Sequence, residues 1–357
     1  MTATETRPAA ATPASIPTAA AVLAGRRDRA RRRALVAGIL AALVVAGFAI
    51  AVMVGPTVYG PVDVIRVIVG ERVPGASFSV GELRLPRASL DVLAGFAFGL
   101  GGVVFQTMLR NPLASPDIIG ITTGSSAAAV LGIVVLGLDD TGVSVLALAG
   151  GLVTALTIYL LAHRRGFAGA RLILIGIGVA AMMQSAISYG LSRAAAWDLA
   201  AAMQWLAGST NGASWESVRP LAIASLVLVP LVLAQGRALG ALRLGDDTAA
   251  ALGVRVSASR VTLILAAVAL LAFATAAAGP IAFVAFMSGP IAARLVGPGA
   301  SLLVPAGFVG ALLVVVADIV GQHVLGARYP VGVVTGALGA PYLIYLLART
   351  HRSGGSL

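Results

Sequence analysis

The stretch RRDRARRRALVAGILAALVVAGFAIAVMV, residues 26–54, decides the fold class. Its first eight residues include six arginines, and an uncharged apolar run from Ala34 to Val54 follows them. A run of about 20 apolar residues is long enough to cross the hydrocarbon core of a bilayer as a helix. A signal peptide also begins with basic residues, but no small-residue cleavage site follows here. The stretch therefore predicts a membrane-spanning helix with its amino end in the cytoplasm. Nucleic-acid binding by the arginines is the weaker alternative.

The composition of the whole chain agrees with a membrane protein. Hydrophobic residues make up 59% of the 357 residues and charged residues only 11%, and the mean hydropathy is +0.97. Soluble domains usually contain about 25% charged residues. These values exclude a soluble enzyme, a coiled coil and a wholly disordered chain. We expect a disordered basic tail over residues 1–33, a transmembrane domain over 34–350 and a short tail over 351–357.

Nine further apolar runs follow the first, and only helices or closed barrels satisfy backbone hydrogen bonds in lipid. Runs of this length indicate helices, so the expected fold is all-α with about ten transmembrane helices. The eighth run is short and flanked by glycine and proline, which is typical of a tilted or re-entrant segment. The nine runs lie at residues 88–108, 118–137, 143–162, 172–191, 217–235, 261–278, 281–296, 301–320 and 332–348.

The distribution of arginine supports ten helices with both termini in the cytoplasm of a bacterium. With that topology, 18 of the 25 arginines fall in the tail and the cytoplasmic loops, and seven fall outside. An excess of basic residues in cytoplasmic loops is the rule for membrane proteins of the plasma membrane. One helix more or fewer would remove this asymmetry.

The chain contains no cysteine, and all its basic residues other than histidine are arginine. Disulfides, thiolate metal sites and cysteine nucleophiles are therefore excluded. A phosphate-binding P-loop requires a lysine, which this chain does not supply. If nucleotide hydrolysis drives its work, another chain must bind ATP and Mg²⁺. We expect no cofactor bound directly to this chain.

The first candidate site is Arg84-Leu85-Pro86-Arg87, at the outer end of the second expected helix. Proline suits the first turn of a helix, where a missing N–H is not needed. Arg87 then lies in that first turn, where the helix dipole disfavours a cation. An arginine in so unfavourable a place indicates a partner that carries carboxylates. Anchoring to a lipid phosphate is the alternative.

The second candidate site is in the expected cytoplasmic loop 237–260. Asp246 or Asp247 is suited to cap a short helix running through Thr248 to Leu252, and Gly253 is suited to end it. Such a helix offers a surface that another protein can contact, although any interhelical loop can hold one. The candidate residues are Gly245, Asp246, Asp247, Thr248, Leu252 and Gly253.

Small residues at helical spacing mark where expected helices approach one another closely, or where they line a translocation path. The expected spans contain almost no ionisable side chains, Asp91 and Asp318 being the main ones, and both lie near outer ends. Ion-coupled carriers place acidic residues near the bilayer middle. No nucleophile–base arrangement is apparent, so an enzyme is not expected. The small and polar candidates are Gly95, Gly99, Gly102, Gln106, Gly332 and Gly336.

Five ordered blocks resemble the FecCD family, the permease subunits of ABC importers for iron-siderophores, haem and cobalamin. The resemblance covers residues 35–350. The blocks are RLPR at 84–87, NPLASPDIIG at 111–120, LGDDTAAALGV at 244–254, GPIAFV at 279–284, and PVGVVT at 330–335 with GAP at 339–341.

The resemblance implies a type II ABC importer permease fold that forms dimers, with the translocation path at the dimer interface. It implies two ATPase subunits beneath the membrane and an extracytoplasmic binding protein above it. Arg84 and Arg87 match positions that present arginines to glutamates of the binding protein. Residues 246–253 match the segment that contacts the ATPase. No nucleic-acid partner is implied.

The chain departs from the family pattern at two places. It reads Ser288-Gly289-Pro290 where relatives usually have a Pro-His pair, and this difference favours pairing with a sister permease over a second copy. Gln322 stands where a third docking arginine is sometimes found, with Arg328 nearby. We expect a permease for ferric siderophores. Haem or cobalamin import, a secondary carrier and a non-transporting membrane scaffold are the alternatives.

Overall fold

The computed structural model describes residues 18–117, 120–163, 169–299 and 301–352, and every regular element in these ranges is a helix. One of them, η1, is a π-helix. The elements are α1 (Ala19–Met53), α2 (Pro61–Ile68), α3 (Ala76–Phe78), η1 (Ser79–Arg84), α4 (Leu85–Met108), α5 (Ile121–Val134), α6 (Asp140–His163), α7 (Gly169–Arg193), α8 (Ala196–Leu206), α9 (Trp215–Ala234), α10 (Gly236–Leu242), α11 (Asp246–Ala251), α12 (Val256–Ala278), α13 (Val284–Val296), α14 (Leu303–His323) and α15 (Val331–Arg352).

The all-α membrane fold expected from the sequence is confirmed. Eight helical segments of the described chain are long and apolar enough to cross a membrane, and α5 and α13 are shorter apolar helices. Together they correspond to the ten expected runs, with α13 as the short eighth one. The third run is shorter than expected, because α5 begins at Ile121; residues 118 and 119 lie outside the described residues. The short helices α2, α3, α8 and α10 were not expected.

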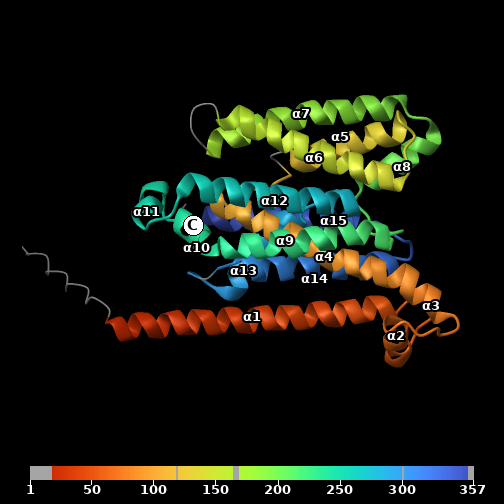
Figure 1. Ribbon diagram of the computed structural model, residues 1–357, viewed down its shortest axis with the longest axis horizontal. Helices are drawn as coiled ribbons and strands as arrows, with labels where there is room; N and C mark the ends of the chain where they lie inside the picture. Colours follow the sequence, from red (N-terminus) through yellow and green to blue (C-terminus); the bar gives the residue numbers. More distant parts are fainter. Residues whose placement is uncertain (1–17, 118–119, 164–168, 300, 353–357) are drawn as a thin grey trace, which may run out of the picture.

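The long helices run side by side and define two ends of the molecule (Figure 1). One end, here called the α11 end, contains the start of α1 together with α10 and α11. The opposite end, called the α2 end, contains α2, α3 and α8. Helices α5 to α8 form a group of their own, which packs on the rest through contacts of α5 and α6 with α12.

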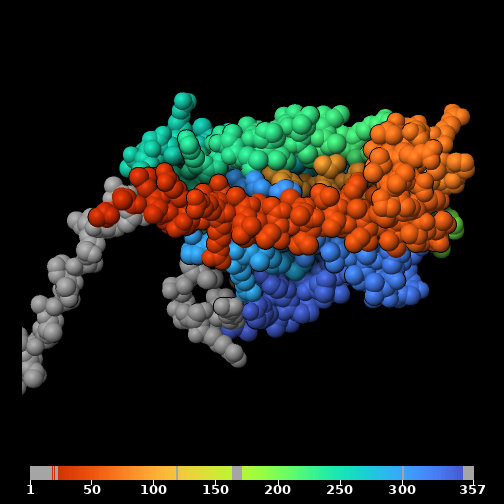
Figure 2. Space-filling view, turned by 90° about the horizontal axis from the view of Figure 1, so that it is seen from below, coloured from red at the N-terminus to blue at the C-terminus, as the bar shows by residue number. Residues whose placement is uncertain are grey.

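Helix α1 begins at Ala19, so residues 19–33 are helical and the expectation of a disordered tail up to residue 33 is wrong for this part. Residues 1–17 lie outside the described residues, as do 353–357 of the expected carboxyl-terminal tail. Figure 2 shows α1 lying across one face of the bundle along its length. Its basic segment is fixed where Arg32 donates from Nε and Nη2 to the carbonyl of Leu295, at 3.3 and 3.2 Å. Leu295 belongs to the last turn of α13, where unpaired carbonyls favour a cation.

Helix α4 lies in the middle of the bundle and is the most buried of the long helices. It packs against α14 where both helices carry small residues. A Cβ added to Gly95 would lie 2.5 Å from the carbonyl of Gly310, and one added to Gly99 would lie 2.2 Å from the carbonyl of Ala306. Only hydrogen at these positions permits the observed approach, which is how small residues hold membrane helices together.

The start of α4 differs from the expectation. Pro86 lies in the first turn of α4, but α3 and η1 precede it without a break, so the helical segment begins at Ala76. Arg87 therefore does not face a free helix amino end, and the dipole penalty inferred from the sequence does not apply. The wider turn of η1 lies immediately before Pro86, where an ordinary α-turn would clash with the proline ring.

Candidate functional site

A cavity of about 650 Å³ opens at the α2 end, and all three arginines expected to dock a binding protein line it. Arg84 comes from η1, Arg87 from α4, and Arg328 from the segment between α14 and α15. Ala51 and residues 54–57, at the end of α1 and just after it, also line the cavity. The fold thus gathers three cations that are up to 244 positions apart in the sequence, from 84 to 328.

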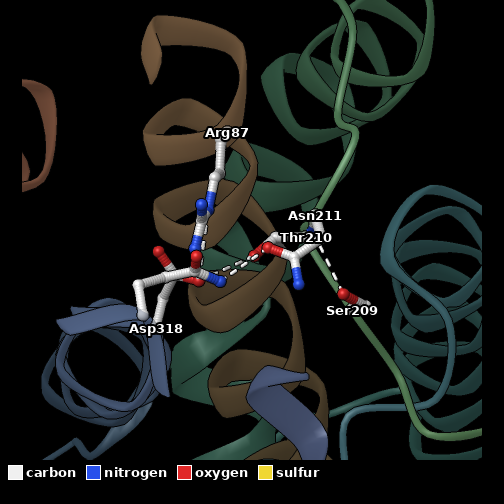
Figure 3. Close-up of polar contacts among 6 residues, drawn as sticks. Arg87, Ser209, Thr210, Asn211 and Asp318 are labelled. Carbon is white, nitrogen blue, oxygen red and sulfur yellow. Dashed lines mark hydrogen bonds and ion pairs between the residues drawn. The ribbon is translucent and has the colours of Figure 1, made fainter. Parts of the chain in front are cut away.

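Arg87 is paired with a carboxylate of this same chain. Its guanidinium forms an ion pair with Asp318 on α14, in which Nε lies 3.2 Å from Oδ1 and Nη2 makes a closer contact. Figure 3 shows Arg87 reaching from α4 toward Asp318, with Thr210 close to the same carboxylate. The unfavourable position of Arg87 therefore does not by itself indicate a carboxylate on another protein, because Asp318 on α14 supplies one. A docking role for Arg87 stays a prediction.

Arg84 is engaged with the backbone that follows α1. Its Nη1 donates to the carbonyls of Val52 and Met53 at 3.1 and 2.9 Å, and its Nη2 donates to the carbonyl of Thr57 at 2.7 Å. The guanidinium also lies over the ring of Tyr59, 5.1 Å from its centroid. Arg84 thus binds carbonyls in the last turn of α1 and in the segment after it, which holds this backbone against η1 at the cavity.

The remaining polar groups leave the cavity positively charged. Arg328 is exposed. Gln322, which stands where some relatives have an arginine, lines the cavity and donates to Asn211 Oδ1 at 2.6 Å. Among the residues that line the cavity, three arginines face one carboxylate, that of Asp318. Such a site favours an anionic group.

At the α11 end, the candidate segment forms the short helix α11, but not with the expected cap. The helix begins at Asp246, its N-cap is Gly245 with φ 114°, and no side chain caps it. Asp246 instead pairs with two arginines, Arg110 at 3.2 Å and Arg260 at 2.8 Å. Gly253 follows the helix with φ 83°, a left-handed conformation that favours glycine and ends helices.

Every side chain from Asp246 to Leu252 is exposed except that of Ala249, and Asp247, Thr248 and Leu252 are the exposed candidates not engaged in the Asp246 ion pairs. Asp247 and Thr248 lie on α11, and Leu252 is its C-cap. The large apolar side chain of Leu252 is 63% exposed at the α11 end. An exposed leucine beside charged and hydroxyl groups offers a mixed surface of the kind that protein partners contact.

Apart from Gly95 and Gly99, which pack against α14, the small and polar candidates fall into three groups. Gly102 packs against α13, where an added Cβ would lie 2.0 Å from the carbonyl of Ala285, and Gln106 donates to the carbonyl of Phe286 at 2.9 Å. Gly332, at the start of α15, approaches the carbonyl of Ala207 just after α8. Gly336 has no atom within 4 Å of an added Cβ, so its side of α15 is open in this chain.

Ser288-Gly289-Pro290, the departure from the family pattern, has a clear packing role. A Cβ on Gly289 would lie 1.9 Å from Gln106 Oε1, so glycine makes room for that side chain between α4 and α13. The hydroxyl of Ser288 donates to the carbonyl of Val284 at 2.6 Å. The described residues contain no group of three or more His, Cys, Asp or Glu side chains that could hold a metal.

Sequence reasoning did not place the partners of these arginines. Asp318 was noticed as one of few charges in the spans, but its pairing with Arg87 depends on the packing of α4 on α14. The carbonyls that bind Arg84, and the pairing of Arg110 and Arg260 with Asp246, have no sequence signal. Within the second block, Ile118 and Ile119 lie outside the described residues.

Comparison with known proteins gives the class. Residues 43–349 match the sequence model of the FecCD transport family. The ferric enterobactin transport system permease protein FepG of Escherichia coli K12 is 40% identical over 291 residues, covering 81% of this chain and 88% of the relative. The achromobactin transport system permease protein CbrC of Dickeya dadantii is 39% identical over 311 residues, covering 86% of this chain and 89% of the relative. The chain therefore belongs to the FecCD transport family of permease subunits.

A solved structure supports the same assignment. An inward-facing metal-chelate type ABC transporter, described as putative, matches with a TM-score of 0.78 at 27% identity, covering 88% of this chain and 98% of the other. The match extends over nearly the whole solved chain, so the arrangement of α1 to α15 is that of an ABC importer permease. The chain is a multi-pass membrane protein.

Proposed function

We propose that this chain is the permease subunit of an ATP-driven importer that moves ferric siderophores across a bacterial plasma membrane. The observation that carries the proposal is the family match over residues 43–349 together with relatives that transport ferric enterobactin and achromobactin. The distribution of arginine supports an orientation with the α11 end in the cytoplasm and the α2 end outside.

The energy source is a separate ATPase that binds ATP and Mg²⁺. This chain has no lysine, so it supplies no P-loop of its own. Helix α11 projects at the α11 end, and its exposed Asp247, Thr248 and Leu252 provide the contact surface for an ATPase dimer. Closure of that dimer on ATP would displace α11 and switch the long helices between outward and inward access.

The cavity at the α2 end is the docking site for an extracytoplasmic binding protein. Arg328 is the exposed cation of the three, whereas Arg84 and Arg87 are partly engaged within the chain. A glutamate of the binding protein entering the cavity would meet all three guanidinium groups. Charge pairs of this kind speed association and fix the register of two partners.

The translocation path runs between this chain and a second permease subunit, either a sister chain or a second copy. Helix α7 is one of the least buried spans, and it exposes three polar side chains on one side, those of Gln184, Ser185 and Ser188. Hydrogen-bonding side chains are costly against lipid, so this side of α7 is suited to face a partner or a polar path. The open side of α15 at Gly336 is a second surface on which another subunit can pack.

Reconstitution tests the proposed function. The chain is purified with its co-purifying ATPase and permease partners and placed in liposomes with the binding protein, and uptake of radiolabelled ferric enterobactin is measured with and without ATP. We expect ATP-dependent uptake. Uptake that is independent of ATP and is abolished by an uncoupler would identify a secondary carrier. Uptake of only haem or cobalamin would change the substrate, and an absence of flux under all conditions would favour a scaffold.

Docking is tested separately by the affinity of the binding protein for the reconstituted complex. Arg328→Glu, and Arg84→Glu with Arg87→Glu, should each weaken docking about tenfold or more while the ATPase remains bound. Arg72→Glu is the matched control, because Arg72 is exposed at the same end and does not line the cavity. Unchanged docking of the cavity variants would exclude this site.

A further inference from the structure

One carboxylate oxygen at the α11 end joins three separate elements. Oδ1 of Asp246, the first residue of α11, accepts hydrogen bonds from Arg110 Nη2 at 3.2 Å and from Arg260 Nη2 at 2.8 Å. Arg110 follows the end of α4, and Arg260 lies in the second turn of α12. Both contacts are charge-assisted, which makes them stronger than hydrogen bonds between neutral groups.

Arg110 makes a further contact that fixes its position. Its Nε donates to the carbonyl of Leu242, the last residue of α10, at 3.2 Å. Its backbone has φ 50°, a left-handed conformation that residues with a side chain adopt only at an energetic cost. The side-chain contacts to Leu242 and Asp246 help to hold the chain in this turn, immediately after α4.

The helices joined in this way differ greatly in burial. Helices α4 and α12 have most of their length inside the bundle, whereas α11 is six residues long and buries only Ala249. Helix α11 packs on α10 and α12. Helix α10, which packs on both α11 and α4, is one connection between those two helices. The Arg110–Asp246 pair adds a direct one to the end of α4, and the Arg260–Asp246 pair adds one to α12.

We propose that Asp246 is a positioning residue that transmits displacement of α11 to α4 and α12. The proposal rests on the proposed function, in which an ATPase moves α11. When α11 moves, the two charge pairs carry the amino end of α12 and the carboxyl end of α4 with it. Without the carboxylate, the ATPase would still bind the exposed surface of α11, but its movement would reach the long helices less completely.

The test compares transport with hydrolysis in the reconstituted complex of permease, ATPase and binding protein. For Asp246→Asn, the amount of ferric enterobactin imported per ATP hydrolysed should fall about fivefold or more, because the hydrogen bonds from Arg110 and Arg260 lose the charge that strengthens them. The amount of ATPase that co-purifies should stay unchanged. Asp246→Glu retains the charge and should recover most of the transport. Arg255→Gln is the matched control, since Arg255 is exposed in the same loop.

A double-mutant cycle separates this role from a structural one. If Asp246 acts through Arg110, then Arg110→Gln combined with Asp246→Asn should lower the transport ratio no further than Asp246→Asn alone. Arg110→Gln alone also tests the proposal if Asp246→Asn fails to fold. An unchanged ratio, or loss of ATPase binding that accounts for all the lost transport, would overturn it. If the wild-type complex shows no ATP-dependent uptake, the proposed function fails first and this proposal fails with it.

Discussion

Arg87 on α4 and Asp318 on α14 form an ion pair that closes one wall of the cavity at the α2 end. The Asp318 side chain is 7% exposed and that of Arg87 is 23% exposed. The pair therefore has two roles, since it joins the two helices that pack most extensively and leaves part of a guanidinium accessible to a docking partner.

Replacement of Asp318 by asparagine should lower the stability of the fold. Arg87 would keep a partly buried charge without its carboxylate, and we expect a loss of about 2 kcal/mol, less than for a fully buried pair. Thermal unfolding in detergent measures the change. Glu71→Gln, which removes the charge of the exposed Arg66–Glu71 pair, is the control and should leave stability nearly unchanged, because solvent screens exposed pairs. Equal shifts for the two variants would contradict a structural role for Asp318.

Gly99→Ala should separate α4 from α14. The added Cβ would lie 2.2 Å from the carbonyl of Ala306, and backbone on both sides leaves no flexible group to move away. We expect a destabilisation of about 1–3 kcal/mol, as for overpacked cores, again measured by thermal unfolding. Gly336→Ala introduces the same methyl group where this chain has no neighbour within 4 Å.

The Gly336 variant distinguishes packing within the chain from packing between subunits. Stability of the isolated subunit should be unchanged by Gly336→Ala. A loss of co-purifying permease partner in that variant would place Gly336 at the subunit interface, in agreement with the proposed dimer. If Gly336→Ala destabilised the isolated chain as much as Gly99→Ala, the open side of α15 would be an incorrect description.

The sequence predicted the fold well because long apolar runs indicate the membrane spans and the placement of arginine indicates their orientation. It predicted a short helix at residues 248–252 because capping residues and glycine are local signals. It did not predict that Asp246 pairs with arginines instead of capping, since Arg110 is 136 positions away. The same limit applies to Arg87, whose carboxylate lies 231 positions along the chain.

Helix starts were predicted less well than helix centres. Helix α1 extends from Met53 back to Ala19 because arginine and alanine favour helix even outside lipid, a property that an apolar window does not register. The start of α4 was misplaced for the opposite reason. Pro86 is a strong signal for a helix beginning, and the π-helical turn that accommodates it has no sequence signal.

Gly289→Ala should destabilise the contact between α4 and α13 in a way that a second substitution repairs. The added Cβ would lie 1.9 Å from Gln106 Oε1, and Gln106 is buried and bonded to the carbonyl of Phe286, so it cannot easily move. We expect a loss of about 1–3 kcal/mol in thermal unfolding. Combining Gly289→Ala with Gln106→Ala should recover part of that loss. No recovery would show that Gly289 acts through some contact other than Gln106.

The stability of the loop between α4 and α5 should depend on pH through Asp117. Burial raises the pKa of its carboxyl above the ordinary value of 3.8, and hydrogen bonds from Thr122 and Ser115 oppose that rise. A carboxyl whose pKa is raised in the folded state stabilises it fully below the ordinary value, and this contribution is lost as pH rises through the folded-state value. Relative to wild type, Asp117→Asn should therefore gain stability as pH rises from 3.8 toward neutrality. Thermal unfolding across that range measures the difference, with exposed Asp247→Asn as control, and parallel curves for Asp117→Asn and wild type would refute the prediction.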